Sequence, residues 1–254
     1  MSFATFEKRG VVAVVTLNRP DRLNAISGAL LTAFETALRA AQDDEATSVI
    51  VLTGAGRAFC SGDDLKEFEL QAENEGSVRE HIEAIQRITK LLLGGRKLVV
   101  GAIHGYAVGG GFEWILNCDL VVAGDNLTAF FPEMDWANFC TGGVTHLLPI
   151  TVGYQRAIEL LVLGERQSAD RLREFGIVNW VVPVNEMLNR AIEIAERIAE
   201  KSAFSVRRLK ATIHGDLGED LWRAVKLEES ATIEAFLRPE AGERVAKFIS
   251  RSRE

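Results

Sequence analysis

Short apolar runs alternate with amphipathic segments along the first two thirds of the chain. Runs rich in β-branched residues predict buried strands at Val11–Leu17, Val49–Thr53, Leu98–Ile103, Leu120–Ala123 and Ile177–Val182. Between these runs, apolar residues recur at helical spacing over Ala29–Ala41 and Arg79–Leu93. Because buried strands alternate with amphipathic helices, the pattern predicts an α/β core.

The pattern changes after Pro183, where the strand-like runs stop. From Glu186 to Lys201, and then to the end of the chain, apolar residues recur at helical spacing. The large apolar residues in this part exceed what a thin helical layer buries by itself, and they are Trp222, Val225, Ile233, Phe236 and Phe248. We therefore expect this part of the chain to dock onto a partner subunit, with packing inside the chain as the alternative.

Composition places the chain among ordinary globular proteins and excludes several classes. Hydrophobic residues make up 47% and charged residues 26% of the 254 residues, which excludes a disordered or collagen-like chain. No apolar run approaches the roughly 18 residues needed to cross a bilayer, so we expect no integral membrane protein. The first ten residues lack the apolar or Arg-rich character of a targeting segment, and a cytoplasmic location is expected.

The charge balance argues against nucleic acid as a partner. Lys and Arg number 29 against 36 Asp and Glu, which gives a net charge of −7, and no window concentrates the basic residues.

Cys60, Cys118 and Cys140 are odd in number and widely spaced, as expected of free thiols in a reducing compartment. Since paired Cys or His motifs are also absent, we expect neither a disulfide nor a metal site.

Three consecutive glycines, Gly109 to Gly111, are the most informative local feature. Such a run costs backbone entropy and is expected where the chain bends unusually or a ligand approaches the backbone closely. At the start of a helix, the N–H groups of the run would bind an anion or an oxyanion. A tight strand-to-helix turn is the alternative. The dinucleotide fingerprint and the P-loop signature are both absent.

Two glutamates stand among large apolar residues. Glu113 lies between Phe112 and Trp114, and Glu133 lies within the aromatic segment Phe130–Trp136. Burial raises the pKa of a carboxyl group toward values useful for acid–base chemistry, so both are candidate proton-transfer groups. The alternative for each is an ordinary glutamate at a helix start, where the helix dipole favours a negative charge.

A third segment, residues 56–67, joins glycines to charged residues. By itself it is typical of a loop that opens a helix, with Asp63 or Asp64 as the capping residue. Cys60 in this segment is expected to be a packing thiol, because no base neighbours it in the sequence.

Taken together, these segments resemble the enoyl-CoA hydratase/isomerase (crotonase) superfamily, in the family's order and over nearly the whole chain. Leu17–Ile26 is similar to the family's N-R-P-x-x-x-N-A-[LI] element, Phe59–Glu67 to F-S-A-G-A-D-L-K-E, and Gly105–Glu113 to G-Y-A-x-G-G-G-x-E. Cys118–Asp119 and Pro132–Glu133 match its C-D and P-E pairs. The resemblance implies an α/β fold: a crotonase-like spiral of ββα units with the acyl-CoA site over residues 1–195, and a C-terminal helical trimerisation region over 196–254.

The resemblance also implies an enzyme that acts on an acyl-CoA thioester. Its chemistry places negative charge on the thioester oxygen, which two backbone N–H groups in an oxyanion hole would stabilise. The family pattern assigns these donors to Asp63, which replaces the usual alanine, and Gly110. It implies that Glu113 activates the water that attacks C3 and that Glu133 gives a proton to C2. Family isomerases commonly manage with the second glutamate alone, so the presence of both favours a hydratase.

By the same resemblance, coenzyme A enters only as part of the substrate, and no metal or redox cofactor is implied. The expected CoA-binding and substrate-binding residues are Arg22, Leu23, Ala25, Asp63, Asp64, Leu65, Lys66 and Gly110. Among them, Arg22 and Lys66 would offset phosphate charge. The expected acyl pocket comprises Phe131, Trp136, Phe139 and Thr141. Its rings favour a short, branched or ring-bearing acyl group, and Thr141 replaces a family glycine whose backbone helps to place the water.

We therefore predict an enoyl-CoA hydratase that adds water across the 2,3-double bond of a 2-enoyl-CoA to give a 3-hydroxyacyl-CoA. The expected assembly is a homotrimer or a dimer of trimers, without nucleic acid or membrane. The nearest alternative is an enoyl-CoA isomerase or another crotonase-type acyl-CoA dehydratase or hydrolase. A crotonase homologue that binds CoA esters or RNA without turnover is a further alternative, which the two glutamates and the lack of a basic helix disfavour.

Overall fold

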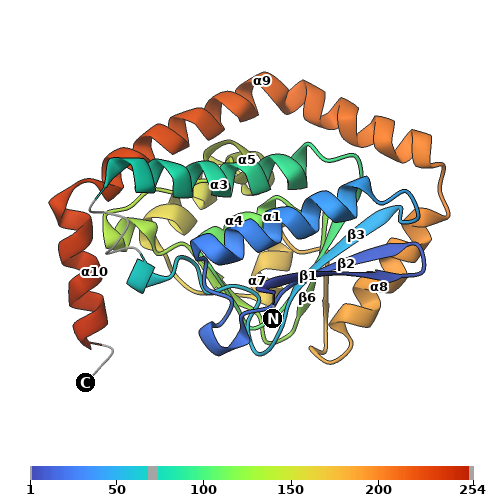
Figure 1. Ribbon diagram of the computed structural model, residues 1–254, viewed down its shortest axis with the longest axis horizontal. Coiled ribbons are helices and arrows are strands. Elements are labelled where there is room, and N and C mark those ends of the chain that lie inside the picture. The colour runs from blue at the N-terminus through green and yellow to red at the C-terminus, as the bar shows by residue number, and fades with distance from the viewer. Residues whose placement is uncertain (1, 68–73, 252–254) are drawn as a thin grey trace.

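The computed structural model describes residues 2–67 and 74–251, apart from the side chains at 214–217, 248, 249 and 251 (Figure 1). Its main sheet has six strands in the order β1-β2-β3-β4-β6-β9, with β1 antiparallel to β2 and the other neighbouring pairs parallel. These strands are β1 (Ala4–Arg9), β2 (Val12–Leu17), β3 (Val49–Gly54), β4 (Leu98–Ile103), β6 (Leu120–Gly124) and β9 (Trp180–Val182). The expected α/β core is present.

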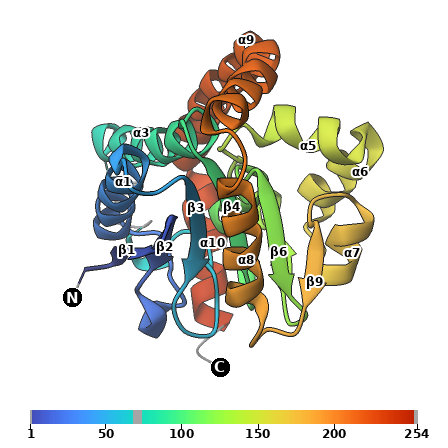
Figure 2. The same ribbon diagram turned by 90° about the vertical axis from the view of Figure 1, so that its right-hand side faces the viewer.

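Both faces of the main sheet are covered, which explains why its strands are continuous apolar runs. Along β2, Ala13 and Val15 face the larger core beneath α1 (Gly28–Asp43) and α3 (Glu75–Leu93), whereas Val14 faces the opposite side. The opposite side packs against α8 (Met187–Ala199), as Figure 2 shows. The predicted boundary between residues 195 and 196 falls inside α8.

A second, three-stranded sheet is formed by β5 (Tyr106–Val108), β7 (Thr128–Phe130) and β8 (Gln167–Ser168). β5 runs straight into Gly109 and the short helix α4 (Gly110–Leu116), so this sheet carries the glycine run and Glu113. The remaining elements before α8 are short helices and turns: η1 (Pro20–Arg22), η2 (Glu133–Trp136), α5 (Val144–Val152), α6 (Tyr154–Ile158), η3 (Glu159–Leu163) and α7 (Ala169–Glu174).

Two helices complete the chain, α9 (Ala203–Phe236) and α10 (Pro239–Arg251). Figure 1 shows the 34-residue α9 crossing the top of the molecule above α3, with α10 descending at one end. Within the described ranges, no helix combines the length and apolarity needed to cross a membrane.

The C-terminal apolar residues correct one expectation. Val225, Ile233 and Phe236 are between 2% and 7% exposed in the single chain, so the prediction that they dock onto a partner is wrong. They are buried because α9 packs lengthwise on α3 and α5. Trp222 is partly buried in the same layer, and the side chain of Phe248 lies outside the described residues.

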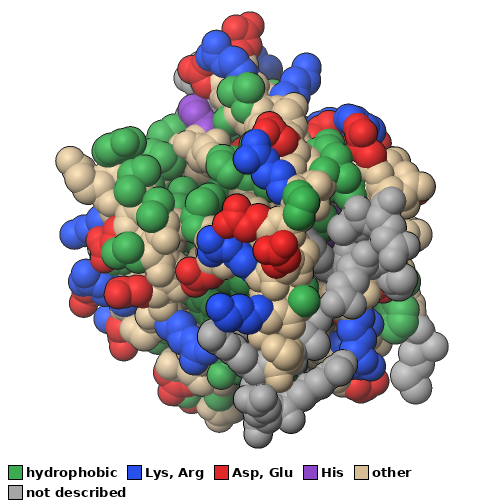
Figure 3. Space-filling model, turned by 90° about the vertical axis from the view of Figure 1, so that its left-hand side faces the viewer, with side chains coloured by type: hydrophobic (Ala, Val, Ile, Leu, Met, Phe, Trp, Pro, Cys, Tyr) green, Lys and Arg blue, Asp and Glu red, His purple; other side chains and the backbone are tan. Residues whose placement is uncertain are grey.

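The surface carries acidic and basic side chains side by side, and Figure 3 shows them interspersed over one face. Apolar side chains gather toward the upper left of that face. Large exposed apolar residues occur on α5, α6 and η3, namely Ile150, Tyr154, Ile158, Val162 and Leu163. Others lie on the outer side of α9, including Phe204, which is 78% exposed.

Candidate active site

One pocket brings together segments that are far apart in the sequence. Asp63, Gly110, Glu113, Glu133 and Thr141 all line it. Its apolar wall includes Ile82 and Ile85 of α3, which sequence reasoning did not assign to the site although their helical spacing is plain. The structure thus places both predicted glutamates and both predicted N–H donors at a single pocket.

Glycine is required in this run for two reasons, which are the backbone conformation and the close approach of neighbouring side chains. Gly109 has a φ of 52°, in the region that favours glycine, and a Cβ there would lie 2.6 Å from Oε1 of Glu133. A Cβ at Gly110 would lie 2.7 Å from Cδ1 of Ile26. The run therefore turns the chain from β5 into α4 while the backbone stays in contact with one of the two glutamates.

The N–H groups of Asp63 and Gly110 are both left without a hydrogen-bond acceptor among the described residues. Gly110 is the first residue of α4, so its N–H points out of the helix start. Next to Asp63, Ile26 N–H donates to Gly62 O at 2.8 Å and Asp64 N–H donates to Ile26 O at 2.9 Å. In this parallel pairing the N–H of Asp63 faces away from Ile26.

Glu113 is buried and accepts two hydrogen bonds from a single residue. It is 2% exposed, and the backbone N–H of Thr141 donates to Oε1 at 2.7 Å while the Thr141 hydroxyl donates to Oε2 at 2.5 Å. Burial raises the pKa of Glu113 to about 8, against the lowering effect of the Thr141 donors. Thr141, expected as a replacement for a family glycine, thus holds the glutamate through both its backbone N–H and its hydroxyl.

Glu133 lies in a different environment at the start of η2. Its Oε2 is buried and has no hydrogen-bond partner in the described part of the chain. Burial, and then the nearby charge of Glu113, raise the pKa of Glu133 well above its ordinary value. Thr141 donates two hydrogen bonds that favour the ionised form of Glu113, whereas Oε2 of Glu133 has no such partner, so of the two glutamates Glu133 holds its proton more firmly.

The loop that precedes α1 presents the expected CoA-binding residues in a left-handed turn. Leu23 has a φ of 53°, and Asn24, with a φ of 55°, anchors the turn by donating to Ala58 O at 2.8 Å. Arg22 is exposed, whereas Ala25 is buried. The sequence motif contains Asn24, but its anchoring role needs the contact with a segment 34 residues away.

The other half of the expected CoA site follows Asp63. Asp64 Oδ1 accepts from Lys66 N–H at 3.1 Å, as predicted for a capping residue, and its Oδ2 lies 2.7 Å from Arg19. Leu65 packs against the core and the Lys66 side chain is exposed. Lys66 therefore offers a charge to a ligand, whereas the charge of Asp64 is already paired.

Three of the four expected acyl-pocket residues, Trp136, Phe139 and Thr141, line the pocket. The place predicted for Phe131 is wrong. Its ring stacks on Phe112 with the centroids 4.4 Å apart and is 1% exposed within the core. In an extended segment Phe131 and Glu133 would share a side, but Pro132 between them has helical backbone angles (φ −88°, ψ −2°), so the alternation is broken and Phe131 turns into the core.

Sequence reasoning missed a third buried glutamate, Glu228 of α9. It is 1% exposed, and its carboxylate accepts bonds from Gly143 N–H, Thr145 N–H and the Thr145 hydroxyl, each at 2.7 Å. Its signal in the sequence is a spacing of three from Val225 and four from Thr232, which places it on the buried face of α9.

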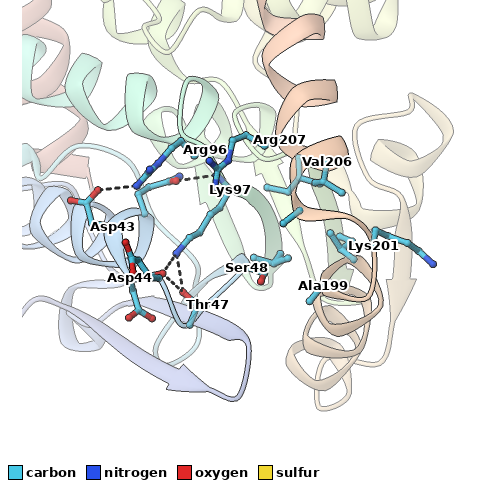
Figure 4. A pocket seen from close by; sticks show the side chains of 16 residues that line it. Asp43, Asp44, Thr47, Ser48, Arg96, Lys97, Ala199, Lys201, Val206 and Arg207 are labelled. Carbon is cyan, nitrogen blue, oxygen red and sulfur yellow. Dashed lines mark hydrogen bonds and ion pairs between the residues drawn. The ribbon is translucent and has the colours of Figure 1, made fainter.

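A second pocket, shown in Figure 4, holds none of the predicted site residues. It lies between the end of α1, the start of β4 and the turn from α8 to α9. Lys97 lines it and donates to Ala41 O and Asp44 O, both at 2.6 Å, and to the Thr47 hydroxyl at 3.0 Å. Lys97 thereby satisfies carbonyls at the end of α1, which is a structural role.

Residues 7–251 match a family model that is described as enoyl-CoA hydratase/isomerase. The chain belongs to this family. A probable mitochondrial enoyl-CoA hydratase of Dictyostelium discoideum is 33% identical over 225 residues, which cover 89% of this chain and 80% of that protein. The short-chain-enoyl-CoA hydratase of Clostridium acetobutylicum is 31% identical over 96% of this chain and 94% of its own length.

Solved structures agree with the family assignment. Pseudomonas aeruginosa OdaA superposes with a TM-score of 0.90 at 29% identity, covering 98% of this chain and 99% of that one. An enoyl-CoA hydratase/isomerase from Mycobacterium paratuberculosis gives a TM-score of 0.90 at 26% identity, with coverage of 97% and 98%. The predicted crotonase fold and membership of an enzyme family are thus confirmed.

Proposed function

We propose that this family member is an enoyl-CoA hydratase, which adds water across the 2,3-double bond of a 2-enoyl-CoA to give a 3-hydroxyacyl-CoA. One observation carries the proposal: Glu113 and Glu133 line the same pocket in different environments, because Thr141 donates two hydrogen bonds to Glu113 whereas Oε2 of Glu133 has no partner among the described residues. Adding water requires a base for the water and an acid for the carbon, and this pair supplies one of each.

In the proposed mechanism, the Glu113 carboxylate accepts a proton from a water molecule as the water oxygen bonds to C3. Electrons of the double bond move toward the thioester oxygen, and Glu133 gives its proton to C2. The N–H groups of Asp63 and Gly110 form the oxyanion hole for that oxygen, and the loss of one such donor costs on the order of 10²–10³ in rate. Reprotonation of Glu133 and deprotonation of Glu113 restore the starting state, so the mechanism needs no metal or redox cofactor.

The exposed residues around the pocket support an acyl-CoA substrate. Arg22 and Lys66 would face the phosphates of the CoA moiety, which lies along residues 22–25 and 63–66 in this proposal. Trp136 and Phe139 would contact the acyl group beyond C3. Ile82 and Ile85 complete an apolar wall that suits a short or ring-bearing chain.

The test uses 2-hexenoyl-CoA in D₂O with mass spectrometry of the products. A gain of one water together with deuterium at C2 is expected. Glu113→Gln is a matched variant because an amide can still accept from Thr141 N–H, and it should lower kcat by about 10²–10⁴. A shifted double bond without added water would instead establish an isomerase, and an unchanged substrate would contradict both activities.

We also propose a homotrimer or a dimer of trimers in the cytoplasm. The exposed apolar residues on α5, α6 and η3 support subunit contacts, since monomers rarely leave such groups uncovered. Free Cys60, Cys118 and Cys140 support a reducing compartment. Sedimentation equilibrium should give a multiple of three subunits, and a monomer would contradict the assembly. Cell fractionation tests the location, because relatives carry mitochondrial and peroxisomal names.

A further inference from the structure

Glu228 has no part in the water addition described above, yet it is among the most thoroughly bonded side chains near the pocket. Its two carboxylate oxygens accept three hydrogen bonds of 2.7 Å from Gly143 and Thr145. Gly143 precedes α5 and has a φ of 76°, and no side chain of its own segment caps that helix. Glu228 therefore caps α5 from another helix, 85 residues along the chain.

The loop between η2 and α5 is held from two sides around Thr141. On α9, one turn after Glu228, the Thr232 hydroxyl donates to Cys140 O at 3.3 Å. Directly after α4, the Asn117 amide donates to Gly142 O at 2.8 Å. The residues immediately before and after Thr141 are thus tied to neighbouring helices, and the next anchor is formed by the three hydrogen bonds that Gly143 and Thr145 donate to Glu228.

Thr141 in turn is the residue that holds the carboxylate of Glu113. Both of its donors reach that carboxylate, and a Cβ at the next residue, Gly142, would lie 3.0 Å from the Cβ of Glu113. The loop and the glutamate pack so closely that a displacement of one moves the other. The negative charges of Glu228 and Asp63 raise the pKa of Glu113, and the charge of Glu113 in turn raises the pKa of Glu133.

We propose that Glu228 is a positioning residue for the general base: it fixes the 140–145 loop so that both donors of Thr141 stay on Glu113. The inference deepens the proposed hydratase function and rests on it for its kinetic test. Glu228 touches neither the substrate nor the reacting water in this scheme. Its effect reaches the reaction only through Thr141 and Glu113.

Glu228→Gln tests the proposal, because the amide keeps the size of the side chain but turns an NH₂ group toward one of the donors. We expect kcat for 2-hexenoyl-CoA to fall at least about tenfold while KM stays within about twofold. The matched control is Glu234→Gln, the same change on the exposed side of α9, which should leave both constants unchanged. An unaltered kcat in Glu228→Gln would overturn the inference.

A double variant separates positioning from general damage to the fold. In the Glu113→Gln background, Glu228→Gln should cause no further loss, since the residue acts through Glu113. An equal loss in that background would overturn the inference. If Glu228→Gln does not fold, Thr145→Ala removes one of the three bonds at an exposed position and should lower kcat in the same direction, with an unchanged kcat counting against the inference.

Hydrogen–deuterium exchange gives a readout that does not depend on turnover. Peptides covering residues 139–145 should exchange faster in Glu228→Gln than in wild type or Glu234→Gln. Faster exchange together with a wild-type protein that does not hydrate the substrate would reject the proposed function but keep the link between Glu228 and the loop. Unchanged exchange would reject the link itself.

Discussion

His81 Nε2 lies 3.1 Å from a carboxylate oxygen of Asp63, and the side chain of His81 is 4% exposed. Asp63 stands where the family pattern has an alanine, and its backbone N–H is one of the proposed oxyanion donors. An extra carboxylate at this point opposes the negative charge that develops on the thioester oxygen. The hydrogen bond from α3 gives that carboxylate a fixed partner beside the pocket.

This relationship predicts a suppressor effect. His81→Leu removes the hydrogen bond to the Asp63 carboxylate. The freed carboxylate then opposes the charge on the thioester oxygen more strongly, so kcat should fall about tenfold. Asp63→Ala in the same background keeps the backbone N–H and removes the charge, and it should recover most of the loss. Steady-state kinetics of the two variants measure this, and a double variant as slow as His81→Leu would show that the carboxylate charge is not the cause.

The raised pKa of Glu113 predicts how stability depends on pH. Its folded-state pKa is about 8 against an ordinary value of 4.5, so its contribution to stability is fully present at low pH and is lost as pH rises through about 8. The melting temperature of the substrate-free protein should therefore fall more steeply between about pH 5 and pH 9 than that of Glu113→Gln. Parallel curves for the two proteins would contradict the buried position of Glu113.

Gly109 offers a prediction with an internal control. Gly109→Ala forces a Cβ to within 2.6 Å of Glu133 at a positive φ, whereas Gly10 has a similar φ of 58° with open space around it. Both alanine variants should lose about 1 kcal/mol or more of unfolding free energy to backbone strain. Only Gly109→Ala should also lose turnover. Equal kinetics in the two variants would mean that Glu133 tolerates displacement.

Lys210 makes an ion pair that joins α9 to the main sheet, with Lys210 buried and Asp119 partly buried. Its Nζ donates to Asp119 at 2.7 Å, to Leu92 O at 2.8 Å and to Lys97 O at 3.0 Å. Asp119 also accepts from Val99 N–H at 2.7 Å, so it fixes the start of β4. Lys210→Met should lower the free energy of unfolding by about 1–3 kcal/mol, measured by urea titration, because the partly buried carboxylate and two carbonyl oxygens lose their donor. A loss below about 1 kcal/mol would show that water replaces the ammonium group.

The predicted strands and helices agree with the structure where apolar residues are buried on a regular face. The predicted run at Leu98–Ile103 is β4, because both faces of the sheet are covered and every residue of the run had to be apolar. β1 was missed because its outer half is exposed and polar, as the burial of Ala4–Arg9 shows. β5 and β7 have three residues each, too few to give a period.

In the functional site, too, residues in local motifs could be predicted, whereas roles that depend on distant contacts could not. Glu113 and Glu133 stand in local motifs, so the sequence contains their signal. The role of Glu228 depends on contacts with residues 83 and 85 positions away, which no local pattern encodes. The family resemblance places Phe131 in the acyl pocket, yet the direction of its side chain is a property of the folded chain.

The anchoring of the 140–145 loop by α9 bears on how this enzyme can be divided. A fragment ending at residue 199 would retain Asp63, Gly110, Glu113 and Glu133, the groups that carry out the proposed reaction. It would lack Glu228 and Thr232, and with them the support on one side of Thr141. If Glu228 acts as proposed, catalytic competence is not a modular property of the N-terminal part of the chain, and α9 is a component of the reaction centre.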